Sequence, residues 1–360
     1  MNPKIFSPIT LRGIEVSNRV WLSPMCMYAC PDEDGAVGDF HLAHYGAVAL
    51  GGSGMLITEA TAVRPEGRVT PQDAGLWAAE QMFAWKRVTD FVHAAGSRIA
   101  VQLAHAGRKG SKYRNLPGDA PDRGSVAAEQ GGWKTKGATR QAFGYLSAPE
   151  ILSEEEVWEI IRSFADAAER AEKAGFDAVE LHGAHGYLLH EFLSPLTNQR
   201  DDQWGGSPEA RESFLLKTVR AVREVLSPET PLLVRLSVSD VTDGGMTAEA
   251  SATLAERLAE QGADFIDCSS GGLLPNVDYK AYPGYQVADA RTVRSSGVPV
   301  GAVGLITEPE QAAEIVEDGS ADVVLLGRAM LRDPHWPRRA ANALGATQAV
   351  PPPPQYHRAW

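Results

Sequence analysis

Eight short apolar runs are the feature of this chain that most constrains its fold. They occupy residues 20–22, 54–57, 98–101, 178–181, 232–235, 265–268, 298–300 and 322–326. Most of them are followed by amphipathic stretches with apolar residues at helical spacing, such as 154–174, 208–226, 247–261 and 308–318. Alternating strands and helices predict a parallel sheet. Eight such repeats predict a closed α/β fold, the (β/α)8 TIM barrel.

A doubly wound open sheet is the alternative fold. It would need a glycine-rich turn after its first strand, where this chain has Ser23-Pro24-Met25-Cys26. The chain has 360 residues, a length at which barrel enzymes often form one domain. We therefore predict a single barrel domain over residues 1–360.

Three additions to the barrel are expected. Residues 5–20 alternate apolar and polar side chains around Arg12-Gly13, which predicts a β-hairpin ahead of the first barrel strand. Residues 107–147, after the third strand, are rich in glycine, proline and charge, and a connection this long is typical of a loop that flanks an active site. Four consecutive prolines predict a stiff, extended C-terminal tail over 351–360, which we expect to form an interface.

Composition excludes several classes of function. The net charge of -12 argues against a nucleic-acid partner, which requires a basic surface. No run approaches the ~20 apolar residues that span a bilayer, and the first residues lack the apolar run of a signal peptide. Three cysteines do not make a disulfide framework, so we expect a cytoplasmic protein. Cys26 and Cys30 have no second cysteine pair, which argues against a structural zinc site.

Candidate functional residues follow the strands, because chemistry in a TIM barrel sits at the carboxyl ends of the strands. The last two strands lead to Gly304 and to Gly327-Arg328, small residues and one guanidinium that are typical of a barrel phosphate site. Two tight turns with a surface arginine are the alternative. Arg235 ends the fifth run and should face the barrel mouth, where it would meet an anionic ligand or pair with Asp267 or Glu59.

The fourth strand is followed by two imidazoles and a phenol. His182 and His185 are three residues apart, and the glycines and alanine around them leave open space on their polar side. Two imidazole N–H groups can converge on one oxygen atom, which is what a developing enolate or phenolate requires. Tyr187 adds a phenol suited to donating a proton. Metal binding by His182, His185 and Glu191 is the competing interpretation, but no H-x-H pair ends the strand, and we expect no metal.

The segment HGAHGYLLHEFLSPLTNQRDDQWGGSPEAR, residues 182–211, resembles the most specific segment of the old yellow enzyme family of flavin-dependent ene-reductases. The resemblance runs from FSPITLRGIEVSNRVWLSPMCMY through LLGRAMLRDP to QYHRAW, nearly the whole chain. Ser23 to Cys26 with Tyr28, and the ending from Tyr356 to Trp360, are similar to the thermophilic-like bacterial branch.

The resemblance implies a tightly but non-covalently bound FMN at the barrel mouth, reduced by NADPH. It implies that Arg235 stabilises the anionic reduced flavin, that Gly327 and Arg328 hold its phosphate, and that Cys26 tunes its potential. Gly304, from the phosphate-site interpretation above, completes the expected cofactor set. That set is Ser23, Pro24, Met25, Cys26, Ala60, Gln102, Arg235, Gly304, Gly327 and Arg328.

The resemblance also implies the reaction. Hydride passes from reduced flavin to the β-carbon of an α,β-unsaturated carbonyl compound, an enone, maleimide or nitroalkene type of substrate. His182 and His185 bind the substrate oxygen, Tyr187 protonates the α-carbon and Tyr28 touches the substrate. Arg358 is expected to reach the substrate pocket of a partner subunit in a homodimer or a dimer-built homotetramer. Two rival functions are a metal-dependent barrel hydrolase and a flavoprotein that binds phenols as a sensor.

Overall fold

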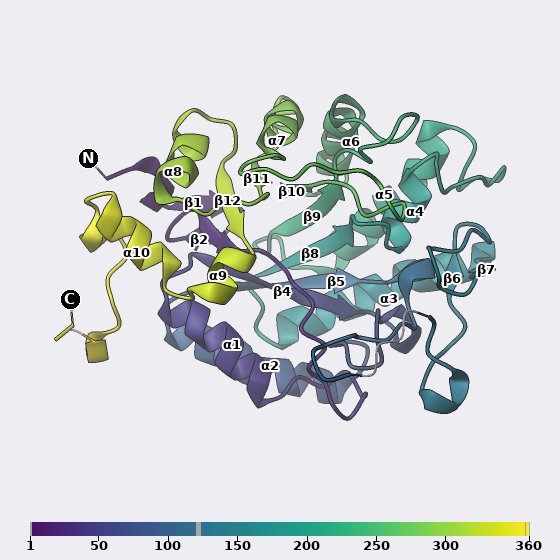
Figure 1. The fold of residues 1–360 in the computed structure, drawn as a ribbon, viewed down its shortest axis with the longest axis horizontal. Helices are drawn as coiled ribbons and strands as arrows, with labels where there is room; N and C mark the ends of the chain where they lie inside the picture. The colour runs from purple at the N-terminus through teal and green to yellow at the C-terminus, as the bar shows by residue number, and fades with distance from the viewer. Residues whose placement is uncertain (1, 120–123, 357, 360) are drawn as a thin grey trace.

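Eight parallel strands close into a barrel, as predicted (Figure 1). The computed structural model describes residues 2–119, 124–356 and 358–359. Around the barrel the strands follow one another in chain order, and the last pairs with the first. The barrel strands are β3 (Val20–Leu22), β4 (Met55–Ala62), β5 (Arg98–Ala104), β8 (Ala178–Gly183), β9 (Leu232–Ser237), β10 (Phe265–Ser269), β11 (Val300–Ala302) and β12 (Val323–Leu326).

Helices surround the barrel, with α1 and α2 on one side and α6, α7 and α8 on the opposite side (Figure 1). They are α1 (Asp39–Leu50), α2 (Ala79–Ala94), α3 (Glu154–Lys173), α4 (Leu188–Leu193), α5 (Pro208–Val225), α6 (Ala248–Glu260), α7 (Val287–Arg294), α8 (Pro309–Glu317), α9 (Arg328–Arg332) and α10 (Trp336–Ala343). Each of the eight apolar runs contributes a strand. The seventh strand starts at Val300, two residues later than its run, because Pro299 has no N–H to donate to a ladder.

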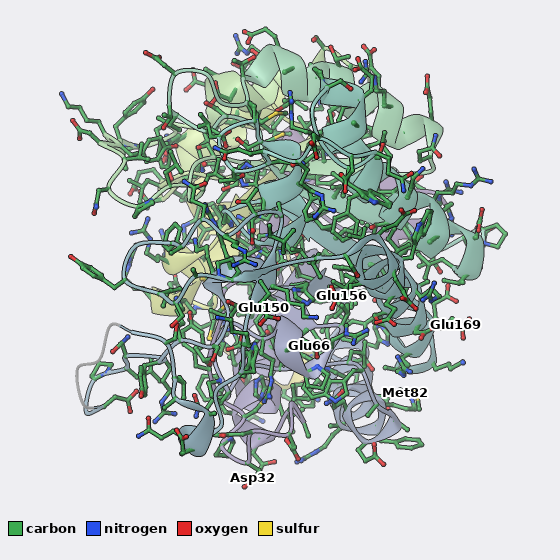
Figure 2. The ribbon with its side chains drawn as sticks, turned by 90° about the vertical axis from the view of Figure 1, so that its right-hand side faces the viewer. Asp32, Glu66, Met82, Glu150, Glu156 and Glu169 are labelled. Atoms are coloured by element: carbon green, nitrogen blue, oxygen red, sulfur yellow. The ribbon has the colours of Figure 1, made fainter. Side chains whose placement is uncertain are left out.

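Local sequence explains where two long helices begin. Ser153 Oγ accepts a hydrogen bond from the Glu156 backbone N–H at 3.3 Å, and the Glu156 carboxylate accepts one from the Ser153 N–H at 2.9 Å. This reciprocal pair caps α3, and Figure 2 shows Glu156 and Glu169 along that helix. At α5, Ser207 Oγ accepts a hydrogen bond from the Ala210 N–H at 3.2 Å, and Pro208 is the first residue of the helix.

The predicted hairpin is confirmed and closes the N-terminal end of the barrel. β1 (Ile9–Leu11) pairs antiparallel with β2 (Ile14–Val16). Leu11 and Val16 pack into the apolar cluster inside the barrel, together with Trp21, Met55, Ile57, Ala100, Ala178, Leu233, Phe265, Val323 and Leu325. The Trp21 and Phe265 rings lie 5.1 Å apart at the centre of this cluster. The hairpin therefore shields the N-terminal half of the barrel interior from water.

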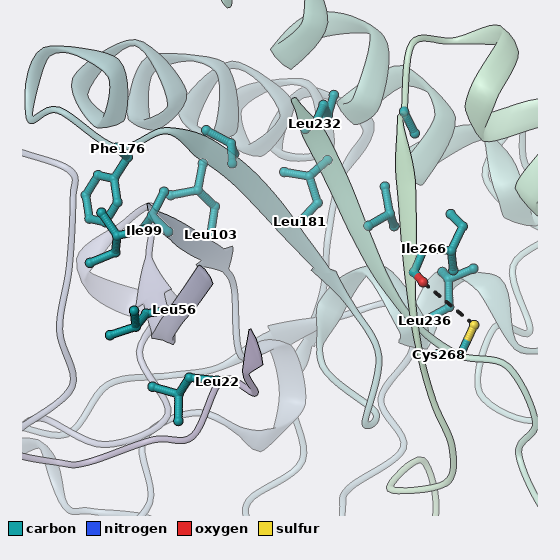
Figure 3. Packing of buried hydrophobic residues seen from close by; sticks show 14 of the residues in the cluster. Leu22, Leu56, Ile99, Leu103, Phe176, Leu181, Leu232, Leu236, Ile266 and Cys268 are labelled. Atoms are coloured by element: carbon teal, nitrogen blue, oxygen red, sulfur yellow. Dashed lines mark hydrogen bonds between the residues drawn. The ribbon is translucent and has the colours of Figure 1, made fainter. Parts of the chain in front are cut away.

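A second, larger core lies between the strands and the helices. Figure 3 shows part of it, with Leu22, Leu56, Ile99, Leu103, Leu181, Leu236 and Ile266 among its labelled members. Side chains alternate between the two cores along each strand because successive residues of a strand face opposite sides. On β9, for example, Leu232 and Val234 face the helices and Leu233 faces the barrel interior.

The additions after β5 and after α10 are irregular. The connection from β5 to α3 holds short 3-10 turns at Gly107–Lys109 and Ala128–Gln130, and two-residue strands β6 (Lys136–Gly137) and β7 (Glu150–Ile151). The chain beyond α10 leaves the barrel on the α10 side (Figure 1). Within the described ranges, no helix combines the length and apolar character needed to cross a membrane.

Candidate active site

The two imidazoles and the phenol after β8 come together at the carboxyl end of the barrel. The His182 and His185 ring centroids lie 5.3 Å apart, and the His182 and Tyr187 centroids lie 4.9 Å apart. His185 Nε2 hydrogen-bonds Ser269 Oγ at 2.7 Å. Neither His182 Nδ1 nor His185 Nδ1 has a hydrogen-bond partner among the described residues, and His182 Nδ1 is buried. His182 Nε2 has none among these residues either, so each imidazole keeps a ring nitrogen that could meet a ligand.

The backbone that carries these side chains is a strained turn. His185 and Gly186 both have left-handed conformations, with φ of 57° and 70°. Gly186 is required here, because a Cβ atom would lie 2.5 Å from the Gly272 carbonyl oxygen. The sequence suggested that the small residues leave room beside the histidines. The structure corrects this for Gly186, whose missing side chain instead lets the loop after β10 approach the turn.

Four hydrogen bonds hold the turn and the Gly272 loop beside it, and three of them come from the distant residues Ser237 and Lys109. The His185 N–H donates to Ser237 Oγ at 2.9 Å, and Lys109 Nζ donates to the His185 carbonyl at 2.8 Å and to the Gly272 carbonyl at 3.0 Å. The Gly186 N–H donates to His190 Nδ1 at 2.9 Å. Backbone strain of this kind persists only where surrounding contacts fix it, and it is common at functional sites.

His190 belongs to a buried polar cluster behind the turn. Because its Nδ1 accepts from Gly186, its Nε2 carries the proton and donates to Asp240 Oδ1 at 2.9 Å. Asp240 Oδ2 accepts from Ser194 Oγ at 2.6 Å and from the Met246 N–H at 2.8 Å. Burial raises the pKa of Asp240, but the hydrogen bonds outweigh it and the pKa is lowered overall. Asp240 therefore fixes the tautomer of His190 and, through it, the Gly186 amide.

The electrostatic surroundings keep both histidines neutral and the phenol protonated. Burial, with the nearby charges of Arg235 and Lys109, lowers the pKa of His182 and of His185 well below the ordinary value. Burial raises the pKa of Tyr187 well above the ordinary value. At neutral pH the site thus holds two uncharged imidazoles beside a phenol that keeps its proton.

The loop after β3 lies against this group. Burial raises the pKa of the Cys26 thiol and of the Tyr28 hydroxyl, which interact with each other. After burial, the same two side chains contribute to the raised pKa of Tyr187, so they lie within electrostatic range of its hydroxyl. Tyr28 has a left-handed backbone, with φ of 55°. The expected substrate contact Tyr28 and the expected flavin contact Cys26 are thus brought to the same place as Tyr187.

Next to the histidines, the barrel interior holds ionisable side chains. Arg235 lies 3.2 Å from Asp267 through Nε, without hydrogen-bond geometry, and its Nη2 donates to Ser23 Oγ at 3.3 Å. Gln102, opposite Ala60 in the ladder, donates to Glu180 Oε1 at 2.8 Å. Burial, followed by the charge of Asp267, raises the pKa of Glu180 well above its ordinary value. Arg235 therefore forms the ion pair with Asp267 that was weighed as the alternative to ligand binding. It also contacts Ser23 in the loop after β3.

The loops after β11 and β12 enclose a cavity of about 170 Å3. Gly304, Gly327 and Arg328 line it, as does Arg235. Added Cβ atoms would lie 3.1 Å from Gln286 at Gly304 and 3.2 Å from the Met25 sulfur at Gly327, so both glycines keep the cradle open. The exposed Arg328 guanidinium has no ion-pair partner among the residues that the structure describes. These features fit the phosphate end of FMN, with Arg235 and Gln102 nearer the barrel axis.

Several residues of the site were not predicted. Arg332 lines the same cavity as Arg328. The two arginines are four residues apart on α9 and so lie on the same face of the helix, a spacing from which Arg332 could have been predicted. Lys109 and Asp240 support the turn from other segments, and His190 supports it from α4, the helix that follows the turn. His190 stands in the same segment as His182, but only the fold shows that it meets Asp240.

Two expected residues lie outside this cluster. Glu191, weighed as a metal ligand, accepts hydrogen bonds from the Arg108 and Ala138 N–H groups at 2.8 and 3.4 Å. Over the described part of the chain, no three His, Cys, Asp or Glu side chains gather closely enough to hold a metal ion. Arg358 is exposed on the tail; His357 and Trp360, which the sequence grouped with it, lie outside the described residues.

Comparison with known proteins agrees with this geometry. The chain is 43% identical over 361 residues to an NADPH dehydrogenase of Bacillus subtilis, with 100% of both chains covered. It is 42% identical to an NADPH dehydrogenase of Geobacillus thermodenitrificans, covering 100% of this chain and 99% of the relative.

Solved structures give the same result. Morphinone reductase superposes with a TM-score of 0.78 at 28% identity, over 99% of this chain and 93% of its own. A 2-naphthoyl-CoA reductase superposes with a TM-score of 0.86 over 97% of this chain but only 53% of its own, and at 24% identity this shows the fold alone. The sequence profile of the NADH:flavin oxidoreductase / NADH oxidase family matches residues 4–346. The chain therefore belongs to this family, the old yellow enzyme family of FMN-dependent oxidoreductases.

Proposed function

We propose that this protein is an NADPH-oxidising ene-reductase, which reduces the carbon–carbon double bond of α,β-unsaturated carbonyl compounds. One observation carries the proposal: two neutral imidazoles, each with a ring nitrogen that no described residue bonds, pack beside a protonated phenol at the barrel mouth. That arrangement suits a substrate whose oxygen gains negative charge while a neighbouring carbon takes a proton.

FMN is proposed to lie between the first loop and the cavity of β11 and β12. Ser23 to Cys26, Ala60, Gln102 and Arg235 would line its ring, and Gly304, Gly327 and Arg328 would hold its phosphate. Bound FMN, once reduced by NADPH, supplies the hydride for the β-carbon of the substrate. Arg235 would stabilise negative charge on the ring edge, a role that fits a buried guanidinium held by Ser23 and Asp267.

The chain's own side chains then act on the substrate. His182 and His185 would donate to the carbonyl oxygen, where charge develops, and Tyr187 would deliver its proton to the α-carbon. The strained turn keeps the three groups in register, so little reorganisation accompanies the reaction. Tyr28 would contact the substrate from the first loop.

The decisive experiment is an anaerobic assay of the purified, FMN-loaded protein. NADPH should bleach the flavin absorbance, and cyclohexenone or maleimide should restore it with formation of the saturated product. A sensor that binds phenols without turnover would be reduced by NADPH but would not be reoxidised by either acceptor. That result would refute the ene-reductase assignment and favour the sensor.

Arg358 is proposed to act on the substrate pocket of a partner subunit in a homodimer or dimer-built homotetramer. Its exposure on a tail that leaves the barrel supports this. Arg358→Ala subunits can be mixed with Tyr187→Phe subunits, with exchange confirmed by native mass spectrometry. Action in trans restores one complete pocket per mixed dimer, and activity rises above both parents. Confirmed mixed dimers without that rise would contradict it.

A further inference from the structure

A second cavity, of about 640 Å3, lies beside the active site. It is lined on one side by the long connection after β5, through Lys109, Lys112, Phe143 and Tyr145, and on the other by the loop after β10, through Leu274 and Pro275. Its volume lies within the usual range for sites that bind small molecules. Apart from Lys109, which supports the catalytic turn, none of these residues belongs to the proposed flavin or enone site.

Lys109 joins this cavity to the catalytic turn. Its Nζ donates to the His185 carbonyl and lies 5.1 Å from the Tyr187 ring centroid and 4.3 Å from that of Phe143. The cavity therefore borders the turn that carries His185 and Tyr187. Burial, with the charges of Lys112 and Arg108, lowers the pKa of Lys109 to about 7.

Lys112 differs from Lys109 in its contacts. Its ammonium has no hydrogen bond or ion pair with any described residue, although the chain carries a net charge of -12. The cavity also exposes an aromatic surface, since Tyr145 is 80% exposed. An unpaired cation beside an open aromatic ring matches a ligand with an anionic group next to a flat ring.

We propose that this cavity binds the adenosine 2′-phosphate end of NADPH, with Lys112 contacting the 2′-phosphate and Tyr145 stacking on the adenine. The inference rests on the proposed function, in which NADPH must place its nicotinamide near the flavin. The other end of the dinucleotide then leaves the barrel mouth, and this cavity adjoins that exit. Lys112 would thereby make the enzyme prefer NADPH over NADH, which lacks the 2′-phosphate.

Binding to the holoenzyme tests the inference without turnover. Calorimetry should show that adenosine 2′,5′-bisphosphate binds more tightly than adenosine 5′-monophosphate. Lys112→Gln should weaken the bisphosphate by about 10-fold, the effect of losing one charge-assisted contact, and leave the monophosphate unchanged. Tyr145→Ala should weaken both probes by about 5-fold, because both contain adenine.

Lys134→Gln is the matched control. Lys134 is an exposed lysine of the same connection that does not line the cavity, so its loss changes the net charge equally. In stopped-flow flavin reduction, Lys112→Gln should raise the apparent Kd for NADPH about 10-fold and leave that for NADH unchanged. Equal effects of Lys112→Gln and Lys134→Gln, or equal effects on NADPH and NADH, would overturn the inference. If NADPH does not reduce the wild-type flavin at all, the proposed function fails instead.

Discussion

The two halves of the barrel interior differ sharply although the same strands build both. Towards the N-terminal end, Leu233 and Phe265 belong to a fully apolar cluster sealed by the hairpin. Two residues further along their strands, Arg235 and Asp267 are buried and charged, and Glu180 lies beside them on β8. Strand periodicity places all of these side chains on the inner face, so only their chemistry separates the halves.

The difference teaches where stability and chemistry are placed. The apolar half gains free energy from burial. The polar half reduces this stabilising free energy, because it holds an ionisable group with a strongly shifted pKa and a strained turn. Substitutions in the apolar half should therefore change the stability of the fold, and substitutions in the polar half should change catalysis.

The largest effect is expected from removing both imidazoles. His182→Ala/His185→Ala should lower kcat/KM for cyclohexenone by about 10⁴-fold, since each oxyanion donor is typically worth 10²–10³-fold. It should also abolish the charge-transfer absorbance that phenols give with oxidised flavin, while FMN stays bound. His182→Asn/His185→Asn keeps N–H donors and should recover part of that absorbance. Phenol binding that survives in the alanine variant would show that the oxygen site lies elsewhere.

Substitution in the apolar half should act on folding instead. Phe265→Ala should lower the free energy of unfolding by about 3–5 kcal/mol, the usual effect of emptying a buried aromatic site. Urea unfolding at saturating FMN measures it, because cofactor binding shifts apparent stability. Phe83→Ala, at a side chain that is 67% exposed, is the matched control and should change little. Folded Phe265→Ala protein should keep near-normal turnover. A specific loss of activity would show that the apolar half also contributes to catalysis.

Tyr187→Phe should affect only one half-reaction. Loss of the proton donor should slow flavin reoxidation by cyclohexenone about 10²–10³-fold, as for other general acids. Reduction by NADPH should stay near the wild-type rate, because the phenyl ring keeps the cation–π contact with Lys109. Stopped-flow traces of the two half-reactions separate the possibilities. Equal slowing of both would indicate that Tyr187 positions ligands rather than donating a proton.

The smallest effect concerns Glu180 and pH. Its raised pKa means that the folded state keeps the proton as pH rises, so this stabilisation is complete below about pH 4.3, the unfolded value. It is lost as pH rises through the folded pKa. Glu180→Gln should therefore gain about 1–3 kcal/mol over wild type at neutral pH, and the gain should vanish near pH 4. Unfolding curves across this range test it; a gain that does not change with pH would mean that ionisation is not the cause.

Much of the fold and part of the site could be predicted because their signals are local. The barrel follows from eight runs with short-range periodicity. The clustering of His182, His185 and Tyr187 was predictable because they lie within six residues of one another at a strand end. Arg235 was found because a charge ends an apolar run.

The rest depends on contacts that only the closed barrel creates. Lys109 is 76 residues from the His185 carbonyl that it binds, and Asp240 is 50 residues from His190. Sequence spacing does not show which loops meet. The need for glycine at position 186 is equally hidden, since it comes from the Gly272 carbonyl of another loop.

The pairing of β3 with β12 has a consequence for biosynthesis. The Ser23 N–H donates to the Leu326 carbonyl at 3.0 Å, so the first and last barrel strands present their loops side by side. Residues 23–26 leave the ribosome long before Gly327 and Arg328 exist. If both loops hold FMN as proposed, a chain released early carries half a cofactor site. The yellow colour of the protein would then report that synthesis had reached the last strand and that the ring of strands had closed.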